Sequence, residues 1–303
     1  MLNPILSFSA TRRMRSARTL LVLGGWLAVM LGTALLMMGG LFRAEVTIRG
    51  LHSGVDCYNI LMIVQFALIV LIAPAMTSGA VAGERERQTL ELLLVTNTRS
   101  LRIVWGKALE SFAMLALLLI CGTPVMCLPV ISGAVTPLQV GEGELYLLAV
   151  AFSAVCVGVL ASSLSRSSVS GGILAYLMIF GIAAATTLPL FMDYPESVTN
   201  VVYDNRLLAG LPPADAAGML SPLLFLNPGY GLAALLQGQT DFLGSLLRYQ
   251  DTGRLLCSFK LMDRAGGELI ALISAASFLI LGVLLLFLSA VFVRRRGLSG
   301  KRK

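Results

Sequence analysis

Residues 59–82 read NILMIVQFALIVLIAPAMTSGAVA, and residues 83–107 follow directly as GERERQTLELLLVTNTRSLRIVWGK. The first stretch contains no Lys, Arg, Asp or Glu and is longer than the roughly 20 apolar residues that a helix needs to cross a membrane. The second stretch is dense in charge and begins where the first one ends. This junction of an apolar span with a charged segment predicts a chain that is built in a lipid bilayer.

The composition of the whole chain agrees with that prediction. Of 303 residues, 57% are hydrophobic and only 13% are charged, whereas soluble domains carry about 25% charged residues. The net charge is +7, and the basic residues flank apolar runs, so we interpret them as orientation signals and expect no nucleic-acid partner. Five Cys imply no framework of disulfides, although pairing of Cys57 with Cys257 stays open.

Five further stretches are long and apolar enough to cross a membrane, so the sequence predicts an all-α polytopic protein with about six transmembrane helices. The six ranges are 19–42, 59–82, 112–131, 145–164, 171–192 and 269–293, each free of Lys, Arg, Asp and Glu. With both termini in the cytoplasm, 16 of the 23 Lys and Arg residues lie on the cytoplasmic side, as the positive-inside rule favours.

The parts outside the spans complete the predicted organisation. Residues 1–18 are expected to form a cytoplasmic amphipathic helix, residues 19–192 contain spans one to five, and residues 294–303 form a basic cytoplasmic tail after the sixth span, 269–293. Residues 193–268 hold apolar patches that Pro212, Pro213, Pro222 and Pro228 divide into pieces shorter than a span. We therefore expect an outer re-entrant or interfacial hairpin there, because one extra crossing would place the basic tail outside.

Motifs for catalysis or metal binding are absent from the sequence. His52 is the single His and has no Cys, Asp or Glu at ligand spacing, so no metal site is predicted. The nucleotide-binding P-loop pattern also fails, because Gly106 and Lys107 are followed by Ala108. We expect no enzyme activity, no catalytic residue and no cofactor in this chain, and the energy for any uphill transport must come from another chain.

The cytoplasmic loop over 83–107 has an amphipathic pattern. Read as a helix, Leu90, Leu93 and Leu94 share one face, and the opposite face carries Glu84 and Glu91. The pattern alone leaves two interpretations about equal. The loop is either a solvated connector whose leucines rest on lipid or a docking element for a partner protein.

The longer string APAMTSGAVAGERERQTLELLLVTNTRSLRIVWGK, residues 73–107, closely resembles the signature of ABC type-2 exporter permeases, the membrane subunits of ATP-driven transporters. In that family the segment usually reads E-R-E-x-G-T-L-E-x-L-L-x-T-P and then I-V-x-G-K. Gln88 occupies the usual Gly position, and Asn97 stands where Pro is common. The opening NPILSFSATRRMRSARTL, residues 3–20, is also similar to the start of that family.

The resemblance implies a permease subunit of an exporter in the cytoplasmic membrane. Its implied partners are a second permease copy or a paralogue, the lipid bilayer, and separate ABC ATPase subunits that bind ATP and Mg²⁺. The loop would act as a coupling helix in a groove of the ATPase, and the residues assigned to that contact are Glu84, Arg85, Glu86, Arg87, Thr89, Leu90, Glu91, Leu93 and Leu94.

Two smaller sets of residues belong to the same interpretation. Lys107 and Glu110, spaced i, i+3, either brace the start of the third span or form a plain interfacial pair with no transport role, and the pattern leaves these two interpretations about equal. The family places the second and fifth spans at the dimer centre, which makes candidate pathway residues of Gln65, Ser78, Tyr176, Thr186 and Thr187. An uncharged path of this kind suits a lipophilic or amphipathic cargo better than a small hydrated ion.

Two rival functions stay open. An energy-independent channel or secondary carrier needs a charged ring or an ion site among the spans, and the six predicted ranges contain no such group. A membrane scaffold without transport is compatible with the composition, and it predicts that loss of the ATPase has no effect on cargo.

Overall fold

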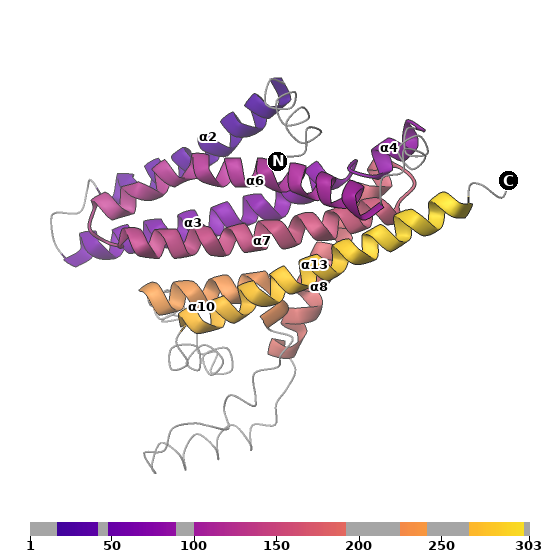
Figure 1. Cartoon of the computed structure of the whole chain (residues 1–303). Helices are drawn as coiled ribbons and strands as arrows, with labels where there is room; N and C mark the ends of the chain where they lie inside the picture. The colour runs from indigo at the N-terminus through magenta and orange to yellow at the C-terminus, as the bar shows by residue number, and fades with distance from the viewer. Residues whose placement is uncertain (1–16, 42–47, 89–99, 192–224, 241–266, 300–303) are drawn as a thin grey trace, which may run out of the picture. The chain divides into compact units, whose positions relative to one another are not determined.

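The structure is a computed structural model that describes residues 17–41, 48–88, 100–191, 225–240 and 267–299. All regular elements in these ranges are helices (Figure 1). Six of them are long and apolar enough to cross a membrane, which confirms the predicted number of spans for the described residues. The chain divides into two compact units, Met1–Ile179 with Phe278–Lys303 and Phe180–Ser277, and each is described by itself.

The bounds of the helices follow the predicted spans closely. The spans are α2 (Ala17–Leu41), α3 (Ile48–Thr77), α6 (Ser100–Ile131), α7 (Pro137–Leu164), α8 (Ser168–Phe191) and α13 (Gly267–Ser299), and two shorter helices are α4 (Ala82–Glu86) and α10 (Pro228–Thr240). The main differences are the early starts of α3, α6 and α7, which were predicted to begin at residues 59, 112 and 145. The predicted basic tail begins as a helix, because α13 continues through Ser299.

The start of α7 has a clear local cause. The Thr136 side chain accepts a hydrogen bond from the Gln139 amide, and the Gln139 side chain accepts one from the Thr136 amide. This reciprocal capping box satisfies two backbone donors that the first turn of a helix leaves open. Pro137 at the first helical position adds a backbone angle already suited to the helix.

In the first unit, α2, α3, α6 and α7 pack on one another (Figure 1). The most buried helix of this bundle is α7, in which every residue from Ser153 to Ser163 is buried. Its small residues let neighbouring backbones approach closely, as in other membrane helix pairs. The contact is tightest at Gly158, where a Cβ atom would lie 1.8 Å from Thr77 Oγ1 of α3.

The first half of α8 is tied to α3 in the same unit. The Tyr176 hydroxyl donates to the Leu71 carbonyl at 2.7 Å. One turn and a half earlier, a Cβ atom on Gly171 would lie 2.7 Å from the Ser78 carbonyl. These contacts bring the start of α8 together with the C-terminal ends of α3 and α7.

The second unit contains α10, inside the loop that was predicted to form a hairpin. Asn227 caps this helix, since its Oδ1 accepts from the amides of Gly229 and Tyr230 at 2.9 and 3.3 Å. Ser274 and Ser277 of α13 both donate to the Phe225 carbonyl. With 13 residues, α10 is too short to cross a membrane. The rest of the 193–268 loop, most of the 1–18 helix and Cys257 lie outside the described residues.

Candidate functional site

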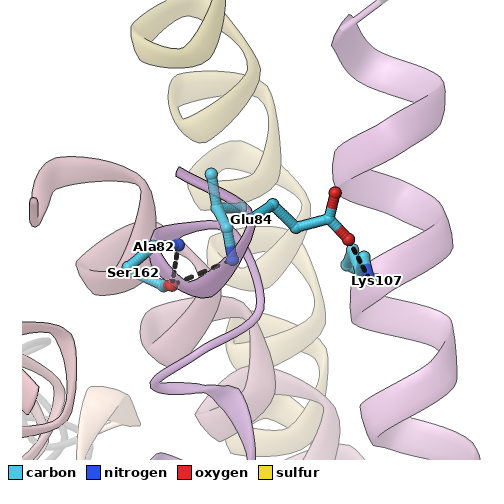
Figure 2. A network of polar contacts seen from close by, with 5 residues as sticks. Ala82, Glu84, Lys107 and Ser162 are labelled. Carbon is cyan, nitrogen blue, oxygen red and sulfur yellow. Dashed lines mark hydrogen bonds and ion pairs between the residues drawn. The ribbon is translucent and has the colours of Figure 1, made fainter. Parts of the chain in front are cut away.

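The short helix α4 follows α3 after a tight turn and lies at one end of the bundle (Figure 1). Its N-cap, Val81, makes no side-chain cap hydrogen bond, so another part of the chain must satisfy the first amides. Ser162 of α7 does this. Its Oγ accepts from the amides of Val81 and Ala82, both at 3.0 Å, and donates to the Ser78 carbonyl at 2.8 Å (Figure 2).

The Glu84 side chain joins α4 to α6. Its Oε1 lies 2.8 Å from Lys107 Nζ, and the two side chains are 23% and 29% exposed (Figure 2). A partly exposed ion pair of this kind contributes about 0.2–1 kcal/mol. Lys107 therefore braces the charged segment through Glu84. Glu110 lies one turn further along α6, and its predicted part in this brace stays a prediction.

The next two residues of α4 contact two other spans. The Arg85 guanidinium donates to the carbonyls of Ser163 and Ser165 at the end of α7, where helix carbonyls are otherwise unpaired. The Glu86 carboxylate accepts from the Ser168 amide at 3.0 Å and from its hydroxyl at 2.5 Å. Ser168 begins α8, and a carboxylate suits the positive end of a helix dipole.

Glu84, Arg85 and Glu86 thus contact three different spans, α6, α7 and α8. We call these three residues with Ser162 and Lys107 the α4 clamp. All five residues of the clamp lie in the first compact unit of the chain. The clamp therefore ties the start of the charged segment to the bundle.

The helix in this segment is shorter than the amphipathic pattern predicted. It ends at Glu86, Arg87 is its C-cap, and Gln88 has a positive φ of 58°. A residue in the left-handed conformation ends an α-helix, because the chain after it no longer follows the helix path. Here the Gln88 amide donates to the Arg85 carbonyl at 3.1 Å, which closes the last turn of α4. One continuous helix from Glu84 through Leu94 was therefore wrong. Gln88 stands at the position where the resembled family usually has Gly, the residue that adopts this conformation at no steric cost.

The remaining predicted contact residues of the loop lie outside the described residues. They are Thr89, Leu90, Glu91, Leu93 and Leu94. Their assignment to a partner contact stays a prediction.

The candidate pathway residues use their polar groups inside the chain. Gln65 is fully buried and donates to Glu144, and Ser78 donates to the Ala75 carbonyl. Tyr176 binds the Leu71 carbonyl, and in the second unit Thr186 binds the Ile182 carbonyl of its own helix. Thr187 lies in α8, and its side chain is outside the described part of the structure. Contact of any of these residues with cargo stays a prediction.

Glu144 is a residue that the sequence analysis did not single out. It was placed before the fourth span, yet it lies inside α7 and accepts hydrogen bonds from Gln65 Nε2 at 3.0 and 3.3 Å. The signal that would have found it is the capping box at Thr136, which starts the helix before Glu144. The described residues contain no group of His, Cys, Asp and Glu that could hold a metal ion.

Comparison with known proteins agrees with this architecture of six apolar spans. The profile of the family described as ABC-2 family transporter protein matches residues 12–295. No curated protein matches the chain. Because the family profile covers nearly the whole chain, including all six spans, this protein belongs to the ABC-2 family of transporter proteins and is a multi-pass membrane permease.

Proposed function

We propose that this chain is the permease subunit of an ATP-binding cassette exporter, which moves a substrate across the cytoplasmic membrane. ATP hydrolysis is supplied by a separate ATPase subunit that binds ATP and Mg²⁺, and a second permease copy or a paralogue completes the transporter. Membership of the ABC-2 family supports the transport function. The observation that carries the coupling is the α4 clamp, in which three consecutive charged residues contact three spans.

The clamp gives ATP hydrolysis a way to act on the spans. An ATPase can shift the permease between conformations only by binding one of them more tightly, so its contact must be rigidly linked to the helices that move. Residues 89–99 connect α4 to α6, and α4 is bound to α6, α7 and α8. In this proposal Leu90, Glu91 and Leu93 contact the ATPase, and the clamp passes their displacement to the bundle.

A charge exchange between Glu84 and Lys107 tests the coupling. The chain is co-purified with the ABC ATPase subunit that it binds, and the hydrolysis rate of that subunit is measured with the complex in nanodiscs. We expect Glu84→Lys and Lys107→Glu each to lower permease-stimulated hydrolysis, because each places like charges together at 2.8 Å. The double variant restores the ion pair and is the matched control, so it should recover most of the rate.

The docking contact is tested separately. Leu93→Asp should lose the ATPase in a pull-down while the chain still inserts in the membrane. Unchanged hydrolysis in both single charge variants, or an ATPase that never co-purifies with the unaltered chain, would refute the proposed coupling.

A secondary carrier is the second candidate, and Glu144 is the observation that favours it. An ionisable side chain within a span is a common element of proton- and ion-driven transport. Transport into sealed vesicles separates the two. Dependence on ATP and inhibition by vanadate support the exporter, whereas transport driven by an imposed proton gradient without ATP supports the carrier.

A further inference from the structure

A second polar cluster lies at the other end of α7 from the α4 clamp. Glu144 of α7 and Gln65 of α3 form its centre, joined by the hydrogen bonds from Gln65 Nε2. At 1.5 Å per residue, Glu144 lies about 30 Å along the helix from Leu164. That distance is about the thickness of the hydrocarbon core, so Glu144 and the end of α7 at the α4 clamp are about one membrane thickness apart.

The hydrogen bonds of this cluster are incomplete. Gln65 is fully buried and its Oε1 has no donor, and Trp26 of α2 is 1% exposed while its Nε1 has no acceptor. Among the described residues, Gln65 is the only donor to the Glu144 carboxylate, and no Lys or Arg pairs with it. Buried polar groups without partners are costly in an apolar setting and are rare in native proteins. In the part of the chain that the structure describes, Gln65 Oε1 lacks a donor, and the Glu144 carboxylate has one amide donor but no cation beside it; a carboxylate in this setting suits a cationic ligand that donates hydrogen bonds.

Two glycines bring these groups together. A Cβ atom on Gly122 of α6 would lie 3.1 Å from Trp26 Nε1 and 3.2 Å from Gln65 Nε2, so the two side chains converge on one point of α6. On Gly143 of α7, a Cβ atom would lie 2.5 Å from the Met62 methyl group. The cluster is therefore built by four helices of one compact unit, and its wall is aromatic and thioether in character.

We propose that Glu144 and Gln65 form a recognition site for the protonated amine of an amphipathic cargo. This inference rests on the proposed exporter function and names its substrate class. An ammonium group supplies the positive charge that Glu144 lacks and adds N–H donors to its carboxylate, which Gln65 Nε2 holds in place. Glu144 is partly exposed, so a ligand reaches it from the surface of the bundle. At the hydrocarbon edge, the charged head of an amphipath contacts the carboxylate while its tail stays in lipid.

Binding of dodecylamine to the full chain in nanodiscs of neutral phospholipid tests the proposal. Trp26 fluorescence reports occupancy in a Trp105→Phe background, and empty nanodiscs correct for partition into lipid. Two probes with the same chain length provide the comparison. Dodecanol is neutral, and dodecyltrimethylammonium is charged but has no N–H donor. We expect dodecylamine to bind about tenfold more tightly than dodecanol, with the trimethyl compound between them.

Variants at the carboxylate decide the outcome. Glu144→Gln should weaken dodecylamine binding about tenfold, whereas Glu144→Asp should retain most of it. The matched control is Glu142→Gln, which removes the same charge from the same helix two residues away. Equal binding of dodecylamine and dodecanol, unchanged binding by Glu144→Gln, or an equal loss in Glu142→Gln would each overturn the proposal.

The binding assay needs no ATPase, whereas the pull-down needs no amine. Failure of the amine site therefore leaves the coupling result intact, and failure of the coupling leaves the binding result intact.

Discussion

Replacement of Ser162 by Ala is the sharpest test of the α4 clamp. Ser162 Oγ is the acceptor for the amides of Val81 and Ala82, and both amides are buried. A buried donor that loses its acceptor costs about 1–3 kcal/mol, so Ser162→Ala should destabilise the start of α4 by about 2–6 kcal/mol. The loss should be local, because the apolar packing of the spans does not depend on this hydroxyl.

Ser163 provides a matched control one residue away. It is also fully buried, but its hydroxyl donates only to the Leu160 carbonyl of its own helix at 2.7 Å. Such intrahelical bonds contribute little to stability, and Ala is the better helix former. Ser163→Ala should therefore change the stability of α4 by less than about 1 kcal/mol.

Amide hydrogen exchange of the chain in nanodiscs measures the difference directly. A local loss of about 2 kcal/mol corresponds to about 30-fold faster exchange through local opening. We expect this acceleration for the amides of residues 81–87 in Ser162→Ala and not in Ser163→Ala, with permease-stimulated ATP hydrolysis falling only in the first. Equal protection of these amides in the two variants would refute the assignment of Ser162 as the cap of α4.

Two further substitutions follow from backbone geometry. Gly158→Val should prevent stable packing of α3 on α7, because a Cβ atom there would lie 1.8 Å from Thr77 Oγ1. Gly141→Val on the same helix is the control, since a Cβ atom at Gly141 meets nothing within 4 Å. The yield and thermal unfolding of the two purified variants in detergent check this prediction, and equal stability of the two would contradict it. Gln88→Gly should stabilise the end of α4 by about 1 kcal/mol, since glycine adopts the left-handed conformation without strain. We expect slower amide hydrogen exchange at residues 85–88 in this variant, and faster exchange would contradict the prediction.

The spans could be predicted from the sequence because lipid leaves the backbone few choices. An uncharged apolar stretch of sufficient length must satisfy its own amides and carbonyls, and a helix does so within one segment. The helix ends were harder to predict. Charged residues were taken as the limits of the spans, yet α6 includes Lys107 and α7 includes Glu144. Helices extend beyond the hydrocarbon, so a cap such as Thr136 marks their start better than the first charge does.

The sequence identified the charged residues of the candidate site but not all of the residues that they contact. Charge density and the family resemblance identified Glu84, Arg85 and Glu86 from the sequence. The partners of Arg85 and Glu86 were not predictable, because Ser163 and Ser168 lie about 80 residues away and carry no charge to suggest pairing. Serines in membrane helices usually bind their own backbone, and only the fold shows which of them reach another helix.

The α4 clamp and the amine site that we propose are connected by one element. Ser162 and Glu144 lie on α7, about 27 Å apart along its axis, and α7 is the most enclosed helix of its unit. A well-packed helix moves as a body, because compressing it costs more than displacing it. Each contact of the clamp alone is worth little, since Glu84 and Lys107 are partly exposed. Binding α6, α7 and α8 at the same time restrains α4 more than any one of these contacts does, so in the proposed coupling a displacement of α4 is passed to α7.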